Sequence, residues 1–475
     1  MSHLSQKVVP LLTAVLVRRK VIVPGSAPHS IEAVRLLPSL HAAPGFAKNR
    51  VDFNFSHHPQ RTIMMRQLHR SWYARRTKGC GRWTNRPLAV LLAMVLQVAF
   101  IPRGRGEDHV DYRYEGYQED DNRIGVQTHA LLFDVTLKEG LLAVKGELVH
   151  DAVSGATPSG AAPAAKYNYD SVPLFGFQVP ILGNTNSTSV PMQHMQDERK
   201  ALSLEMPITL GVHSLSPQFS YSEESDYVST GGALNYTVAL NEKNTMLTLG
   251  LAHTWDRVRD DHGGIRDKQS SDFLVGVNQL LGTKTTFGVN FTYGQSSGYL
   301  NDPYRFIVAA NDLQIDAENP SGYVELRPTE REKFIGRVSL TQFVTPANAS
   351  VEAAYRFYHD SFGIDAHLFE VAWYQKLGKR VVISPGFRYY RQAAASFYYE
   401  LLPDSNNKPA YYSSDYRLSE LQSLTFGVNL TVKATKWLTF DAGYKRYIME
   451  GLDGVTSATA YPSANVFTVG LRFLF

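Results

Sequence analysis

Cysteine is almost absent from this chain of 475 residues. The single residue of this type, Cys80, lies upstream of an apolar run from Pro87 to Ile101. No cysteine remains after that run to form a disulfide framework or to ligate a metal. Small disulfide-stapled domains and Cys-ligated zinc sites are therefore excluded for the chain beyond Ile101.

Acidic side chains are scarce at the N-terminal end, where Glu32 and Asp52 stand against 17 Lys and Arg among the first 105 residues. The remainder of the chain holds 31 basic and 42 acidic residues, a net charge of −11. The overall charge of +4 therefore reflects the N-terminal part alone. A nucleic-acid partner is not expected, because the basic excess does not extend into the bulk of the protein.

Long hydrophobic runs are also missing. The stretch from Pro87 to Ile101 is shorter than the roughly 20 apolar residues of a membrane-spanning helix. Several arginines precede it, which is the arrangement of a secretory signal, and an uncleaved signal anchor is the alternative. We expect residues 64–106 to form the signal peptide region. Residues 1–63 show no periodicity and suggest an over-extended, unstructured N-terminus.

After the apolar run the dominant pattern is an alternation of apolar and polar residues. In Thr286–Tyr293 every odd residue is apolar, and Leu424–Thr431 and Phe467–Phe475 repeat this pattern. Alternation with a period of two places all apolar side chains on one face of a strand. We expect Asp441, Lys445, Arg388 and Arg472 on the opposite, polar face.

The connections between these strands alternate in length. Short turns are expected at Lys138–Gly140, Gly211–His213, Glu242–Asn244, Gly282–Lys284, Pro346–Asn348, Leu377–Lys379 and Lys433–Lys436. Longer polar loops are expected near 152–198, 257–270, 295–331, 398–419 and 449–464, and shorter ones on the same side near 118–123, 222–227 and 360–364. Seven turns and eight loops predict about 16 strands (14–16), with both ends on the short-turn side. The fold expected for residues 107–475 is all-β, a transmembrane antiparallel barrel of the bacterial outer membrane. A soluble all-β protein is the alternative.

One segment is unusual for barrel scaffolding. Asp151, Ser154, Gly155, Ala156 and Thr157 follow the expected strand Leu141–His150, and small residues surround a single terminal hydroxyl. Such a backbone could approach a phosphate-bearing group closely, with Thr157 as the nucleophile, and Asp151 could accept hydrogen bonds from the N–H groups of a turn. The alternative is a structural turn of small residues.

These five residues resemble the D-x-x-S-G-A-T target of the periplasmic flavin transferase, which transfers flavin mononucleotide (FMN) from FAD to the last Thr. The resemblance implies covalent FMN on Thr157, with Asp151, Ser154, Gly155 and Ala156 as the recognised surroundings. It also implies the transferase as a partner.

A wider resemblance covers roughly Tyr112 to Phe475. The segments Arg123–Val126, Asp151–Pro158 and Ser222–Tyr227 resemble, in that order, an outer-membrane barrel family catalogued as domain of unknown function thirty-five seventy. That resemblance implies a flavinylated component of extracytosolic electron transfer with a redox partner of unknown identity. Outer-membrane lipid and the barrel assembly machinery are further expected partners.

Other candidate groups are weaker. The acidic residues Glu223, Glu224 and Asp226 suit a solvated loop. An interfacial girdle near the loop-side strand ends is expected for the paired tyrosines Tyr389–Tyr390, Tyr398–Tyr399 and Tyr411–Tyr412. Asp256, Asp260, Asp261, His262 and Asp267 have irregular spacing for a divalent cation. The strand histidines His129, His150, His253 and His367 lack metal-ligand spacing. No metal site and no catalytic residues are expected.

Two functions follow from these observations. The first is a redox carrier with FMN on Thr157, in which the flavin performs the electron chemistry. The second is a passive porin or solute channel without a cofactor. An enzyme is the less favoured class, because no nucleophile–base pair was found in the strands.

Overall fold

The computed structural model describes residues 108–138, 140–160, 169–174, 177–182, 190, 192–260, 262–311 and 322–475. The expected signal region 64–106 and the stretch 1–63 lie outside these residues. No helix of the described part is long and apolar enough to cross a membrane. Its helical elements are 3₁₀ turns at Asp120–Asn122, Thr345–Ala347, Tyr416–Leu418 and Ala458–Ala460.

The remaining elements are strands. The first half of the chain forms β1 (His109–Glu119), β2 (Ile124–Lys138), β3 (Leu142–Pro158), β4 (Tyr169–Leu174), β5 (Phe177–Leu182), β6 (Met192–Glu205), β7 (Ile208–Leu210), β8 (His213–Glu223), β9 (Tyr227–Leu240) and β10 (Thr245–Arg259). The second half forms β11 (Ile265–Leu280), β12 (Thr285–Gly298), β13 (Phe306–Val308), β14 (Gly322–Val324), β15 (Glu330–Val344), β16 (Ala349–Asp360), β17 (Asp365–Leu377), β18 (Val381–Gln392), β19 (Leu421–Lys433), β20 (Leu438–Gly451) and β21 (Ala464–Leu474).

The large sheet closes on itself. Neighbouring strands pair antiparallel in chain order, and β1 pairs both with β2 and with β21, so no edge remains open. The short strand β7 continues β6 along the flank of β8, and the 17 strands of the sheet therefore make 16 barrel positions. This confirms the predicted antiparallel barrel and its strand number.

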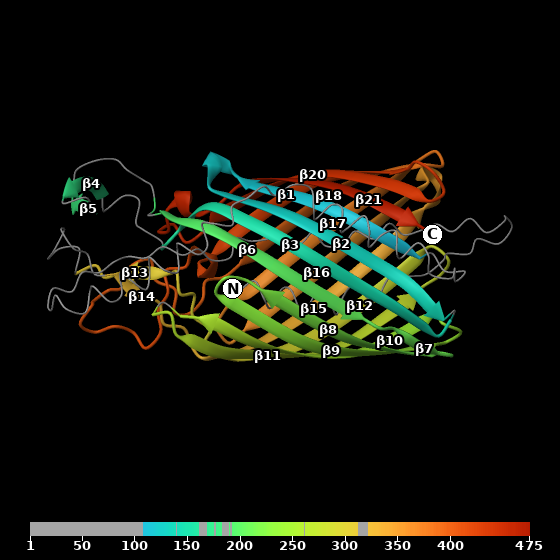
Figure 1. The fold of residues 1–475 in the computed structure, drawn as a ribbon, viewed down its shortest axis with the longest axis horizontal. Coiled ribbons are helices and arrows are strands. Elements are labelled where there is room, and N and C mark those ends of the chain that lie inside the picture. The colour runs from blue at the N-terminus through green and yellow to red at the C-terminus, as the bar shows by residue number, and fades with distance from the viewer. Residues whose placement is uncertain are drawn as a thin grey trace, which may run out of the picture.

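The two ends of the barrel differ as expected. All seven predicted short turns lie at one end, together with the start of β1 and the end of β21, and the longer connections lie at the other. Figure 1 shows this long-loop end on the left, with the hairpins β4–β5 and β13–β14 beyond the strands, and the C-terminus near the right-hand end. Two boundary predictions were wrong: the loop expected at 152–198 begins after Pro158 and ends before Met192, and the loop expected at 257–270 lies between Arg259 and Ile265.

The two faces of the strands also follow the predicted alternation. In β12, Val289 and Phe291 are 40% and 46% exposed on the outside, whereas Asn290 and Thr292 are buried on the inside. An outward band of apolar side chains is suited to contact with lipid, because the hydrocarbon of the bilayer offers no hydrogen-bonding partners to polar side chains. The hydrophobic core is correspondingly small and lies at the long-loop end, where Tyr117, Ile124, Val126 and other residues cluster.

The inner wall carries ion pairs between strands. Arg472 donates to Asp111 at 2.8 and 2.7 Å, which confirms the predicted inward position of Arg472. Lys333 reaches Asp272 at 3.0 Å by crossing over Gly294, where a Cβ atom would overlap the lysine side chain. Other inward pairs are Arg113–Asp441, Arg388–Glu370, Lys145–Glu205 and Lys268–Asp256. Charges of both signs therefore alternate around the inside of the barrel.

Candidate functional site

The segment Asp151–Pro158 forms the long-loop end of β3 rather than a turn. It pairs with β2 on one side and β6 on the other, up to Ile124–Gly155 and Pro158–Met192. Gly155 has a φ of +132°, and a Cβ atom there would overlap the carbonyl of Arg123. Glycine is required at this position because the two backbones approach so closely.

Asp151 faces the barrel interior and is 3% exposed. Its carboxylate accepts hydrogen bonds from Thr128 Oγ1 at 2.7 Å and from Arg199 Nε at 2.5 Å. These are contacts across three neighbouring strands. The expectation that Asp151 accepts from the N–H groups of a turn is therefore wrong, because the chain at this point is paired strand and its side chain is engaged by an arginine.

Thr157 lies on the same inward face of β3 as Asp151. The residue is 6% exposed, and its neighbour Pro158 is also buried. Ser154, by contrast, points outward and is exposed. The structure thus places the three motif side chains on one strand but on opposite faces, with the Thr157 hydroxyl inside the wall at the long-loop end.

The chain just after Thr157 is held by two distant loops. The carbonyl oxygen of Ser159 accepts the N–H of Phe306 at 3.0 Å, and Ser414 Oγ donates to the Phe306 carbonyl at 2.7 Å. We call the described residues 299–311, 322–329 and 393–420 the cap. Its first segment leaves β12 and reaches the end of β3, and five barrel positions lie between these two strands. The cap therefore crosses the long-loop opening of the barrel.

A cluster of alternating charges holds the cap together. Arg327 contacts Glu325 at 2.6 Å and Asp415 at 2.9 Å, and Arg417 contacts Asp302 at 2.5 Å. Four of these groups are nearly inaccessible to water, with Asp415 0% and Arg327 3% exposed, and Arg417 is partly exposed. Buried charges persist only when they are paired and hydrogen-bonded. The conformation of the loop after β12 therefore depends on its contacts with the loop after β18, and the reverse also holds.

The pKa values of the acidic groups in the cap reflect this pairing. Burial by itself would raise the pKa of Asp302 and Asp415, but the arginines at 305 and 417 outweigh it, and both pKa values lie below the usual range. Burial raises the pKa of Glu325, and Asp302 and Asp415 add to this effect against the opposing Arg327. The cap is thus a mixed cluster in which two carboxylates are held ionised.

Aromatic side chains fill the space around these charges. Tyr412 packs against Ile307 and Leu402, and Tyr390 and Tyr398 pack against the apolar residues at the ends of β16 to β18. The expectation of an interfacial tyrosine girdle is therefore wrong for Tyr390, Tyr398 and Tyr412. They face inward because the cap offers them apolar neighbours, whereas Tyr411 is 43% exposed.

A family model described as "Protein of unknown function (DUF3570)" matches residues 96–473. The chain belongs to this family. The match confirms the wider resemblance to this barrel family and covers the described barrel as far as Phe473. No curated protein matches the chain.

Solved structures similar to this DUF3570 barrel are outer-membrane proteins. The siderophore receptor PirA from Pseudomonas aeruginosa has a TM-score of 0.38 at 10% identity and covers 78% of this chain and 62% of its own. CdiB from Acinetobacter baumannii has a TM-score of 0.43 at 8% identity, with 78% and 61% covered. The OmpT loop-deletion mutant of Vibrio cholerae has a TM-score of 0.37 at 10% identity, with 78% and 98% covered. The chain spans about three fifths of the length of the first two. At these identities the likeness concerns the fold.

The remaining candidates in this DUF3570 barrel have structural roles. Asp260 accepts hydrogen bonds from the N–H groups of His262 and Gly264 and pairs with Arg266. These contacts stabilise the turn between β10 and β11. Asp256 faces inward against Lys268. Asp261 lies outside the described residues. Of the strand histidines, His129 and His367 each contact a tyrosine hydroxyl, at 2.8 and 2.7 Å.

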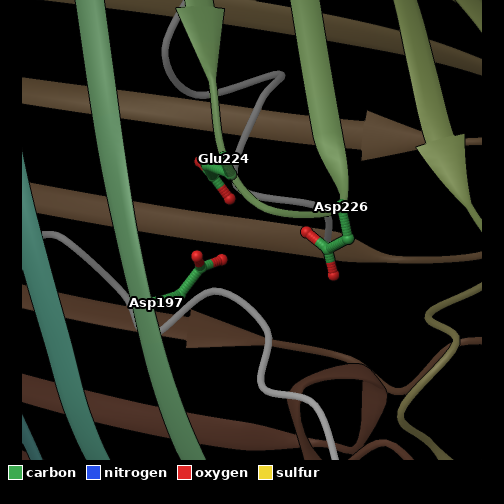
Figure 2. A group of neighbouring side chains, drawn as sticks. All are labelled: Asp197, Glu224 and Asp226. Carbon is green, nitrogen blue, oxygen red and sulfur yellow. The ribbon is translucent and has the colours of Figure 1, made fainter. Parts of the chain in front are cut away.

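The acidic turn that holds Glu224 and Asp226, expected as a solvated loop, includes a third carboxylate from another strand. Glu224 and Asp226, in the turn between β8 and β9, lie beside Asp197 of β6, and Figure 2 shows the three carboxylates directed toward a common space. The sequence offered no means to find Asp197, because it lies 27 residues before Glu224 and outside the acidic run. Sequence reasoning also missed the charged cluster of the cap.

Proposed function

We propose that this outer-membrane barrel carries FMN covalently on Thr157 and serves as a redox carrier in extracytosolic electron transfer. The observation that carries the proposal is the complete set Asp151, Ser154, Gly155, Ala156 and Thr157 in a barrel of this family. When bound, FMN supplies electron transfer, while the protein supplies location and environment. An unidentified redox partner completes the function.

The attachment step balances as a phosphoryl transfer. The hydroxyl oxygen of Thr157 bonds to the phosphorus on the FMN side of the FAD pyrophosphate. The bond from that phosphorus to the bridging oxygen breaks, AMP leaves, and a base of the transferase takes the hydroxyl proton. Thr157 is then joined to FMN through a phosphoester, and no oxidant or reductant is consumed.

The folded geometry favours attachment before the barrel folds. Thr157 is 6% exposed and lies in a paired strand. Ser159, two residues later, is hydrogen-bonded to Phe306 of the cap. A transferase needs a short stretch of free backbone around the hydroxyl. The barrel therefore accepts the group on the unfolded chain in the periplasm, before β3 pairs with its neighbours, and carries it on the inner face afterwards.

The direct test is to express the full chain in a Gram-negative host that exports an active flavin transferase. Wild type should give a fluorescent band after denaturing electrophoresis and an intact mass that includes FMN. Thr157→Ser should keep both properties because it retains the hydroxyl, and Thr157→Val should lose both while the barrel still assembles. Wild type without FMN beside a flavinylated control substrate would exclude the proposal.

The order of events has its own test. Purified transferase and FAD should label the chain unfolded in urea but not the barrel folded in detergent. Equal labelling of both forms would contradict the burial argument, although it would leave attachment to Thr157 intact.

A passive channel is the second candidate function, and the polar inner wall favours it. Ion pairs such as Arg113–Asp441 and Arg388–Glu370 line the interior, as expected for a water-filled lumen. The cap across the long-loop opening limits such a path. Steady conductance in planar bilayers by protein that lacks FMN would favour the channel over the redox carrier.

A further inference from the structure

The acidic group at the rim of the barrel has the geometry of a ligand set. Strand β6 extends past the end of β8, whose last pairing is Glu223 with Lys200. Asp197 lies on this overhang, beside the turn that holds Glu224 and Asp226. One carboxylate oxygen of each of the three residues lies within 4.8 Å of the others, and all three side chains converge (Figure 2).

Backbone contacts hold these side chains in place. Asp197 Oδ1 accepts the N–H of Glu198 at 2.8 Å and that of Ser225 at 3.4 Å, which ties the β6 overhang to the turn. The N–H of Glu224 donates to the carbonyl of Tyr227 at 2.7 Å, so the turn is closed. The three carboxylates are therefore brought together by the backbone of two separate segments, despite their like charge.

A second observation, at Asp226, points to a cation ligand. This residue is 8% exposed; its Oδ2 accepts the hydroxyl of Tyr304, whereas its buried Oδ1 has no hydrogen-bond donor within the described part of the chain. A buried carboxylate oxygen without a donor is costly.

We propose that Asp197, Glu224 and Asp226 bind a divalent cation of the Ca²⁺ type at the long-loop rim of the barrel. Oxygen is the ligand that Ca²⁺ prefers, at about 2.3–2.6 Å, so two oxygens on opposite sides of the ion lie roughly 5 Å apart. The observed separations, up to 4.8 Å, fit that span. Mg²⁺ requires shorter bonds of about 2.1 Å and keeps several of its waters, and Zn²⁺ favours nitrogen and sulfur ligands. Water completes the coordination sphere.

The proposed ion has a structural consequence for the cap. Tyr304 belongs to the cap and donates its hydroxyl to Asp226. A cation on Asp226 fixes the carboxylate that receives this bond and removes the repulsion among the three acids. Ca²⁺ thereby fastens the cap to the rim between β6 and β8, next to the cap residues Asp302 and Phe306, which contact Arg417 and Ser414.

The test is calorimetric titration of Ca²⁺ into the full-length barrel, folded in detergent and freed of metal with EDTA. Wild type should bind one Ca²⁺ with a dissociation constant on the order of 10⁻⁴–10⁻³ M, as in extracellular calcium modules. Asp226→Asn keeps the shape and the acceptor for Tyr304 but should weaken binding at least about tenfold, since one of the few charges that set Ca²⁺ affinity is lost. Glu223→Gln removes one exposed charge next to the site and should leave binding unchanged.

Three outcomes would overturn the site. These are no Ca²⁺ binding by wild type, equal weakening by Glu223→Gln and Asp226→Asn, or tighter binding of Mg²⁺ than of Ca²⁺. The mobility of unheated protein on a gel establishes that each variant still forms the barrel. The variant Tyr304→Phe, which lacks this hydroxyl, should retain the ion, because Tyr304 contacts the ligand Asp226 and not the cation.

Discussion

Removal of Arg327 should open the cap without unfolding the barrel. Its guanidinium contacts Glu325 at 2.6 Å and Asp415 at 2.9 Å, and all three residues are at most 3% exposed. Arg327→Met keeps much of the side-chain volume but leaves two buried carboxylates short of a partner. Breaking a buried ion pair from one side costs about 3–5 kcal/mol. An equilibrium constant changes tenfold for about 1.4 kcal/mol, so the open population of the cap should rise roughly 10²- to 10⁴-fold.

Limited proteolysis of the detergent-folded protein measures this change. When opening and closing are fast, the rate of cleavage within 299–311, 322–329 and 393–420 follows the population of the open form. Arg391→Met is the matched control, because Arg391 pairs with Glu420 at 3.0 Å with both side chains well exposed. An exposed pair contributes about 0–1 kcal/mol, so cleavage should rise less than about fivefold. Equal effects of the two substitutions would refute the assignment of the buried cluster as the element that holds the cap closed.

Two further predictions concern the barrel wall and the pH dependence of the cap. Val428→Arg should destabilise the barrel by roughly 2–4 kcal/mol in lipid because Val428 faces outward; Asn429→Arg on the inward face should cost much less, and equal shifts in the urea midpoint would contradict the assigned faces. The pKa values of Asp302 and Asp415 are lowered in the folded cap, so their stabilisation is present above about pH 4, the pKa of an unfolded Asp, and is lost as pH falls through their folded values. Glu325 acts in the opposite direction, since its raised pKa gives stability that is lost as pH rises. Because two groups act against one, hydrogen exchange of the cap, corrected for intrinsic rates, should be faster at pH 3 than at pH 7; slower exchange at pH 3 would show that Glu325 dominates.

The sequence by itself determined the barrel. Alternation in stretches such as Thr286–Tyr293 is a local property with a period of two, and it fixes which side chains face outward. The short turns are equally local, and together with the longer loops they gave the 16 positions that the structure contains. Inward charges such as Arg472 were predictable for the same reason, although their partners were not. The composition after Ile101 also excluded disulfides, since no cysteine occurs there.

Only the tertiary structure decided what lies at the long-loop end. Loop residues have no period, and their positions follow from contacts between segments far apart in the chain, such as Arg417 with Asp302, 115 residues away. The segment Asp151–Thr157 reads as a turn of small residues, yet pairing with β2 and β6 makes it strand, because Gly155 admits the carbonyl of Arg123. In the same way Asp197 meets the acidic turn only because β6 extends past β8. Folding of the barrel brings these residues together from distant parts of the chain. A local sequence pattern cannot predict such contacts.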